Sequence, residues 1–247
     1  MRNTDKSKDV KKIIKRILLV IILLSFVLYL GIGAVFSLKG YGMYWRAVHE
    51  SSLTERVEEV RSSECFTAYS ELPAFYINAT VAVEDRRFRW HMGVDPIAIC
   101  RALWTDIRAG DFAEGGSTIT QQLAKNMLFT QEKKVERKIA EMLAAIQMEF
   151  RYTKQEIFEL YVNTAYFGSG YYGIYQASMG YFGKEPSELT DYESAMLVGV
   201  LNAPSAYSPD THRELAQQRT AQVLNKMVKY GIITRGEADR IIRESSL

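Results

Sequence analysis

The feature that most constrains this chain is an uninterrupted apolar run near its N-terminus. Twenty residues without a charge, ILLVIILLSFVLYLGIGAVF, extend from Ile17 to Phe36 of a chain of 247 residues. A helix of about 20 apolar residues crosses the hydrocarbon core of a bilayer. Each central Leu, Ile, Val or Phe gains roughly 0.3 to 0.6 kcal/mol on insertion. The sequence therefore predicts a transmembrane signal anchor over residues 17–36.

Charge is distributed very unevenly around this run. Residues 1–16 carry seven basic and two acidic side chains, whereas the whole chain has a net charge of only +2. The positive-inside rule then makes residues 1–16 a cytoplasmic tail and places the rest of the chain outside. A cleaved signal peptide is the alternative, but its apolar stretch would span only about 7 to 15 residues. Because the exported part is net acidic, a basic face for nucleic acid is not indicated.

The exported part reads as helical. Apolar residues repeat with helical spacing over Val135–Phe150, where Val135, Ile139 and Phe150 share one face opposite Arg137. Similar patterns predict helices at residues 154–163, 172–182, 191–201 and 212–230, and strand signals are few. We therefore predict a mainly α domain over residues 70–247, preceded by a linker over residues 37–69. Residues 50–75 are expected to be irregular or partly helical.

Cysteine and histidine spacing adds little. Cys65 and Cys100 could form one bridge in an exported domain, but two unpaired thiols are the simpler interpretation. No spacing of cysteines or histidines is typical of a metal site, so no metal ligands are predicted.

Three polar clusters could carry chemistry. In the first, Glu84 and Asp85 follow the apolar run Ala79–Val83, and apolar neighbours raise a carboxyl pKa toward the range of a general base. A solvated acidic pair, neutralised by Arg86 and Arg87, is the alternative.

The second cluster lies between Gly115 and Asn126. Thr118 and Gln121 have the spacing of a capping box, and the start of a helix offers free N–H groups and a positive dipole end to a phosphate. Gln122 and Lys125 follow on this helix. The motif favours a pyrophosphate site, although an ordinary helix cap would show the same pattern.

The third cluster is Arg137, Lys138 and Glu141 within the amphipathic helix. Their spacing of three and four residues lets all three side chains meet on one face. The two cations would keep the carboxylate ionised or would bind a phosphate. An exposed, salt-bridged face remains the alternative.

Together and in this order, these clusters resemble the glycosyltransferase domain shared by monofunctional peptidoglycan glycosyltransferases and class A penicillin-binding proteins. The first motif of that family is matched by Glu84, Asp85, Phe88, His91 and Gly93. The second runs from Gly115 to Asn126, the third is Arg137, Lys138 and Glu141, and the fourth is Phe158–Asn163. The resemblance covers about residues 70–210.

The resemblance implies a lysozyme-like helical head with a smaller, membrane-associated jaw. It also implies a single-pass protein of the bacterial cytoplasmic membrane that polymerises lipid II into β-1,4-linked glycan strands and releases undecaprenyl pyrophosphate. Lipid II, the growing glycan strand and the membrane are the expected partners, and other cell-wall synthesis proteins remain open. A divalent cation, magnesium or manganese, at the pyrophosphate is also left open. We expect Trp104, Ile107 or Phe112 of the intervening segment to face lipid, with core packing as the alternative.

By this resemblance, Glu84 is the general base, and Glu141 is the second catalytic carboxylate, which positions the cations or assists the leaving group. The expected substrate-binding residues are Ser117, Thr118, Gln121, Gln122, Lys125, Asn126, Arg137 and Lys138. Two other classes of protein compete with this assignment. A glycan-cleaving enzyme would also use a lone acidic residue, but would not need three cations. A non-catalytic scaffold would not need intact Glu84 and Glu141.

Overall fold

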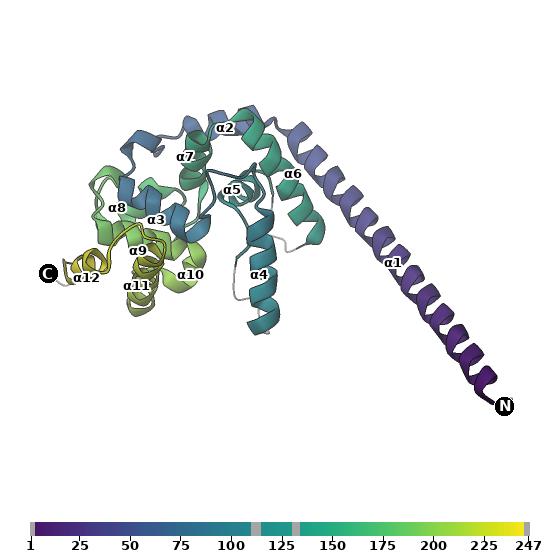
Figure 1. Ribbon diagram of the computed structural model, residues 1–247. Coiled ribbons are helices and arrows are strands. Elements are labelled where there is room, and N and C mark those ends of the chain that lie inside the picture. Colours follow the sequence, from purple (N-terminus) through teal and green to yellow (C-terminus); the bar gives the residue numbers. More distant parts are fainter. Residues whose placement is uncertain (1–2, 110–114, 130–133, 245–247) are drawn as a thin grey trace.

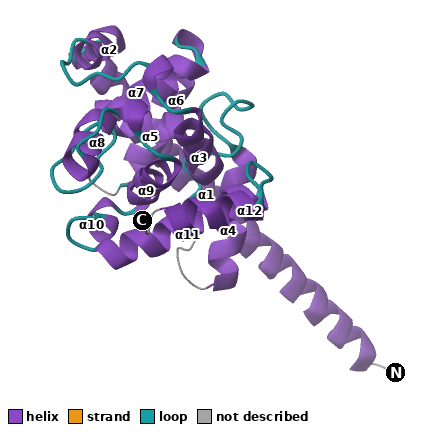
Figure 2. Cartoon of the chain, turned by 90° about the vertical axis from the view of Figure 1, so that its left-hand side faces the viewer, coloured by secondary structure: helices purple, strands orange, loops and turns teal. Residues whose placement is uncertain are grey.

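The computed structural model describes residues 3–109, 115–129 and 134–244, and every regular element in these ranges is helical (Figures 1 and 2). A single bridge between Tyr166 and Tyr172 is the nearest approach to a strand there. The helices are α1 (Asn3–Glu50), α2 (Leu53–Arg61), α3 (Ala74–Glu84), α4 (Pro96–Ala109), α5 (Ile119–Leu128), α6 (Val135–Arg151), α7 (Lys154–Thr164), α8 (Ile174–Phe182), α9 (Asp191–Asn202), α10 (Pro204–Tyr207), α11 (Arg213–Lys229) and α12 (Arg235–Glu244), with short 3₁₀ turns at Tyr69–Glu71 and Pro186–Glu188. The prediction of a mainly α fold is confirmed.

The N-terminal helix projects far from the body of the molecule (Figures 1 and 2). Its segment Leu18–Glu50 is apolar and long enough to cross a membrane, with a mean hydropathy of 2.8 in its most apolar window and none of that window buried. Residues 37–50, at the start of the predicted linker, continue this helix. A half-buried stripe on these residues packs against the domain, which explains why they stay helical.

The core of the domain forms where α5 packs against α6 and α7, and where α3, α9 and α11 meet. Fully buried apolar side chains fill it, among them Tyr76, Ile119, Phe158 and Leu197. Several helices begin at a capping box, in which a Ser or Thr side chain accepts from the third helical N–H and the residue there, Glu or Gln, returns the bond. Such boxes start α2, α5, α7 and α9.

Helix α6 does not place most of its large apolar residues in the core. The buried side is formed by Ala140, Ala144 and Ala145 together with Glu141. Val135 is 58% exposed and Phe150 is 76% exposed. Small residues allow a close approach of α5, so they occupy the core face. The apolar side of α6 is therefore left for other contacts, including α1.

Helix α4 extends from the body toward the same side as the N-terminal part of α1 (Figure 1). On α4, Trp104 is 64% exposed and Ile107 is 77% exposed, so core packing is excluded for both. Phe112 lies outside the described residues. Contact of this helix with lipid stays a prediction. Cys65 and Cys100 are both free thiols, and Cys100 is exposed on α4.

Candidate active site

Half of the predicted site residues line a cavity of about 400 Å³ between the end of α3, the start of α5 and one side of α11; they are Glu84, Ser117, Thr118, Gln122 and Lys125. Its lining is rich in charge. The polar residues in it are Glu84, Asp85, Arg86, Arg87, Asp95, Arg101, Ser117, Thr118, Gln122, Lys125, Asn202, Arg219, Lys226 and Tyr230. The first and second sequence clusters therefore share one cavity, as the resemblance predicts.

Glu84 is the last residue of α3 and its carboxylate faces this cavity. Burial raises its pKa above the ordinary value, while the hydrogen bond from Gln122 and the nearby charges of Lys226 and Arg219 lower it in part. A carboxyl group whose pKa is raised in this way is suited to accept a proton near neutral pH.

Gln122 determines how this carboxylate is held. Its Nε2 donates to Glu84 Oε2 over 2.8 Å, and its Oε1 accepts from the hydroxyl of Tyr161 over 3.3 Å. An ionised carboxylate only accepts hydrogen bonds, so the amide of Gln122 must turn its NH₂ group toward Glu84. The buried Tyr161 hydroxyl then donates to the remaining oxygen, which favours the same orientation.

Asp85 fixes the end of α3 to the first turn of α5. Its Oδ2 accepts from the backbone N–H of Ile119 over 3.0 Å and lies 2.8 Å from His91 Nε2. Both side chains are almost fully buried. Glu84 directly precedes Asp85, and Gln122 lies one turn after Ile119. The bond between Asp85 and Ile119 therefore keeps the Glu84 carboxylate next to the Gln122 amide.

The cations lie on α5 and α6. Glu141, only 2% exposed, forms ion pairs with Arg137 and, over 3.1 Å, with Lys138. Lys138 also donates to the hydroxyl of Ser117 over 2.6 Å, which connects α6 to the loop before α5. Burial lowers the pKa of Lys125; the charge of Glu141 opposes this effect and the nearby Arg137 adds to it. Four charged groups therefore interact, and one of them, Lys125, lines the cavity.

Two predicted binding residues have mainly structural contacts. Thr118 Oγ1 accepts from the N–H of Gln121 over 3.0 Å and donates to the carbonyl of Gly93 over 2.6 Å. Gln121 completes the capping box and is 1% exposed. Thr118 lines the cavity. The predicted residues that do not line it are Gln121, Asn126, Arg137, Lys138 and Glu141.

Comparison with known proteins decides the family. Residues 50–228 match the family described as Transglycosylase. The chain belongs to the transglycosylase family.

Relatives of this transglycosylase are larger proteins. It is 48% identical over 169 residues to penicillin-binding protein 1A of Aquifex aeolicus, covering 68% of this chain and 23% of the relative. It is 45% identical over 169 residues to penicillin-binding protein 1F of Bacillus subtilis, covering 68% and 24%. The chain thus spans about a quarter of the length of these relatives. The crystal structure of penicillin-binding protein 1A from Haemophilus influenzae aligns with a TM-score of 0.36 and 28% identity, over 51% of this chain and 16% of that one.

Two basic residues on α11 of the transglycosylase line the cavity but were not predicted as site residues. Arg219 and Lys226 line the cavity on the side of α11, and both charges lower the pKa of Glu84. Lys226 also donates to the carbonyl of Val83 over 2.8 Å. Their spacing of seven residues places both on one face of a helix, which was the available signal.

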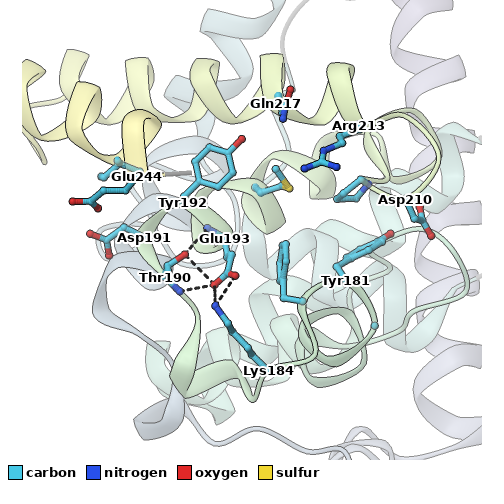
Figure 3. A pocket seen from close by; sticks show the side chains of 15 residues that line it. Tyr181, Lys184, Thr190, Asp191, Tyr192, Glu193, Asp210, Arg213, Gln217 and Glu244 are labelled. Carbon is cyan, nitrogen blue, oxygen red and sulfur yellow. Dashed lines mark hydrogen bonds and ion pairs between the residues drawn. The ribbon is translucent and has the colours of Figure 1, made fainter. Parts of the chain in front are cut away.

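A larger cavity of about 620 Å³ lies elsewhere in the transglycosylase, between α8, α9, α11 and α12 (Figure 3). Its walls include Tyr181, Tyr192 and Arg213, and an ion pair of Lys184 with Glu193 over 2.7 Å. None of the predicted site residues lines it. Among the described residues, no group of three or more His, Cys, Asp or Glu side chains could hold a metal ion.

Removing the amide of Gln122 is expected to shift the pH dependence of the transglycosylase. A base must be ionised to act, so kcat/KM should rise with pH as Glu84 loses its proton. The Gln122 hydrogen bond lowers the pKa of Glu84. In Gln122→Leu the acidic limb of the kcat/KM profile should therefore move to higher pH. Gln217→Leu, in the remote cavity, should keep the wild-type profile. An unchanged acidic limb in Gln122→Leu would contradict this account.

Proposed function

We propose that this protein is a membrane-anchored peptidoglycan glycosyltransferase that polymerises lipid II. The observation that carries the proposal is a cavity lined by a partly buried carboxylate, Glu84, and by Lys125, with Arg137 and Lys138 of α6 close enough to Lys125 to interact with it electrostatically. The carboxylate suits an alcohol nucleophile, and the cations suit a pyrophosphate leaving group. Cleavage of an uncharged glycan would use the carboxylate but would not need the cations.

In the proposed reaction, Glu84 removes the proton from the 4-hydroxyl of the acceptor N-acetylglucosamine. The oxygen attacks C1 of the donor N-acetylmuramic acid from the face opposite the pyrophosphate. The C1–O bond breaks, and its electron pair leaves with undecaprenyl pyrophosphate. Inversion at C1 gives the β-1,4 linkage.

The cations stabilise the charge that develops on the departing pyrophosphate. Fixed charges in a site shielded from water act more strongly than in bulk solvent and need no reorganisation during the reaction. Glu141 holds Arg137 and Lys138 in place through its two ion pairs. Ser117 fixes Lys138 from the opposite side.

A divalent cation at the pyrophosphate stays open in this proposal. The carboxylate next to the cations is Glu141, and it is already engaged by Arg137 and Lys138. The residues therefore fit direct neutralisation of the pyrophosphate by side chains better than a metal held by the protein. Magnesium or manganese brought by the substrate would add to the same stabilisation.

The deciding experiment is a polymerisation assay with the purified full chain and lipid II in detergent. We expect long glycan strands and release of undecaprenyl pyrophosphate in equal number to the bonds formed. Shortening of preformed strands without polymerisation would instead identify a glycan-cleaving enzyme. A complete lack of turnover on either substrate would favour a scaffold.

The proposed topology predicts a protease result. The basic residues all precede the apolar run, so the domain is expected outside the cytoplasmic membrane. Protease added to intact spheroplasts should digest the domain and leave the membrane-embedded fragment. A cytoplasmic marker protein serves as the control for lysis. If the domain survives while the marker is also protected, the orientation is the reverse, and the substrate assignment falls with it.

A further inference from the structure

The C-terminal part of α1, from the last residue of the predicted membrane span onward, is partly covered. Gly40 and Ala47 are buried, and Phe36, Gly42, Met43, Tyr44 and Val48 are half-buried. Phe36, Gly40, Tyr44 and Ala47 have a spacing of three or four residues and lie on one side of the helix. The two helices α1 and α6 pack together along this side. The anchor thus continues into the fold of the domain.

At Gly40 the two helices approach so closely that a side chain has no room. A Cβ atom there would lie 2.7 Å from both Cβ and Cγ2 of Ile139 and 2.9 Å from the carbonyl oxygen of Glu136. The Ile139 Cβ is bonded to the backbone of α6, and the Glu136 oxygen belongs to that backbone. A larger residue at position 40 would therefore force α1 and α6 apart.

The two contacted residues flank the cations of the candidate site. Arg137 and Lys138 lie between Glu136 and Ile139 in sequence. The geometry points to Gly40 as a positioning residue, whose missing side chain lets the anchor helix seat α6 so that Arg137 and Lys138 stand at the pyrophosphate site. This role rests on the proposed function.

The consequence of moving α6 follows from the contacts that cross the cleft. Lys138 is hydrogen-bonded to Ser117 over 2.6 Å, and Lys125 interacts electrostatically with Arg137 and Glu141. A shift of α6 changes the positions of its cations relative to Ser117 and to Lys125 of α5. A misplacement of about 1 Å in a catalytic constellation can cost about 100-fold in rate.

Gly42 provides a matched control two residues further along the same helix. A Cβ atom at Gly42 would meet nothing within 4 Å. Substitution at either glycine makes the same change in side-chain size, hydrophobicity and helix propensity. The first added carbon meets α6 at Gly40 and meets nothing at Gly42.

The test compares Gly40→Leu, Gly40→Ala and Gly42→Leu in the full chain in detergent micelles. We expect Gly40→Leu to lower kcat on lipid II by about 10- to 100-fold, with Gly40→Ala intermediate and Gly42→Leu equal to wild type. Thermal unfolding identifies any variant that fails to fold, and Gly40→Ala, which adds one carbon, then carries the comparison. Hydrogen–deuterium exchange of the α6 amides should be faster in the Gly40 variants alone.

Each outcome bears on the role of Gly40. Faster exchange in α6 together with a lower kcat supports it. Unchanged kcat in folded Gly40 variants overturns it, whether or not exchange in α6 changes, as does an equal loss of kcat in Gly42→Leu. If wild type itself does not polymerise lipid II, the proposed function fails. The exchange data would then still show whether Gly40 seats α6.

Discussion

Replacing Glu84 with glutamine is expected to lower glycan polymerisation by at least about 100-fold, because general-base catalysis typically contributes about 100- to 10,000-fold. The amide keeps the shape of the side chain but cannot take the proton of the acceptor hydroxyl. The cations on α5 and α6 are untouched, so lipid II should still bind. The measurement is the rate of polymer formation from lipid II, together with the affinity for lipid II.

Two controls make this result specific. Thermal unfolding of Glu84→Gln should match that of wild type, which shows that the domain is intact. Glu185→Gln, an exposed glutamate at the other end of the domain, should polymerise at the wild-type rate. Near-normal synthesis by a folded Glu84→Gln protein would exclude Glu84 as the base, and Glu141 would be the next carboxylate to examine.

Replacing Lys125 with methionine is expected to lower both the affinity for the donor and the rate. Lys125 lies in the cleft with no anionic side chain bonded directly to it among the described contacts, so its charge is available to the pyrophosphate. Loss of one electrostatic contact in a transition state typically costs about 100- to 1,000-fold in kcat. Methionine keeps most of the length of the side chain and its apolar stem.

The measurement is kcat and KM for lipid II, because a charge that contacts the pyrophosphate before and during departure affects both. Lys229→Met, at an exposed position near the end of α11, is the matched control and should behave as wild type. A Lys125→Met protein with wild-type kcat and KM would remove Lys125 from the site. A change in KM alone would confine its role to binding.

A second consequence concerns alkaline pH. Burial lowers the pKa of Lys125 below that of an ordinary lysine. Its charge is therefore lost at a lower pH than usual, and polymerisation should decline as pH rises through that range. This decline should be absent from the residual activity of Lys125→Met.

Much of the fold could be predicted from the sequence because local signals and packing agree. The helix at Lys154–Thr164 begins at a Thr153 capping box and continues with buried apolar residues. Its helical spacing of apolar residues and its capping residue both predict the same helix. The grouping of Glu84 with Gln122 and Lys125 was also predicted, but only through the order of motifs. A separation of nearly 40 residues in the sequence does not by itself predict that the end of α3 contacts the start of α5.

Two features could not be predicted, for physical reasons. The amphipathic pattern of α6 reveals an apolar face but not what covers it, and here the alanine side faces the core. Arg219 was missed because its place beside Glu84 depends on the packing of α11 against α3.

The unbroken course of α1 makes the anchor a rod of fixed length. A helix rises 1.5 Å per residue, so Gly40 stands only about 6 Å beyond the end of a span that finishes at Phe36. A flexible linker would let the domain move to varying distances from the membrane and contact glycan strands at any of them. In the proposed topology, a rod seated on α6 limits how far the cleft stands from the bilayer. The proposed lipid-linked substrate stays within that distance, so finished strands would be out of reach once they leave the membrane.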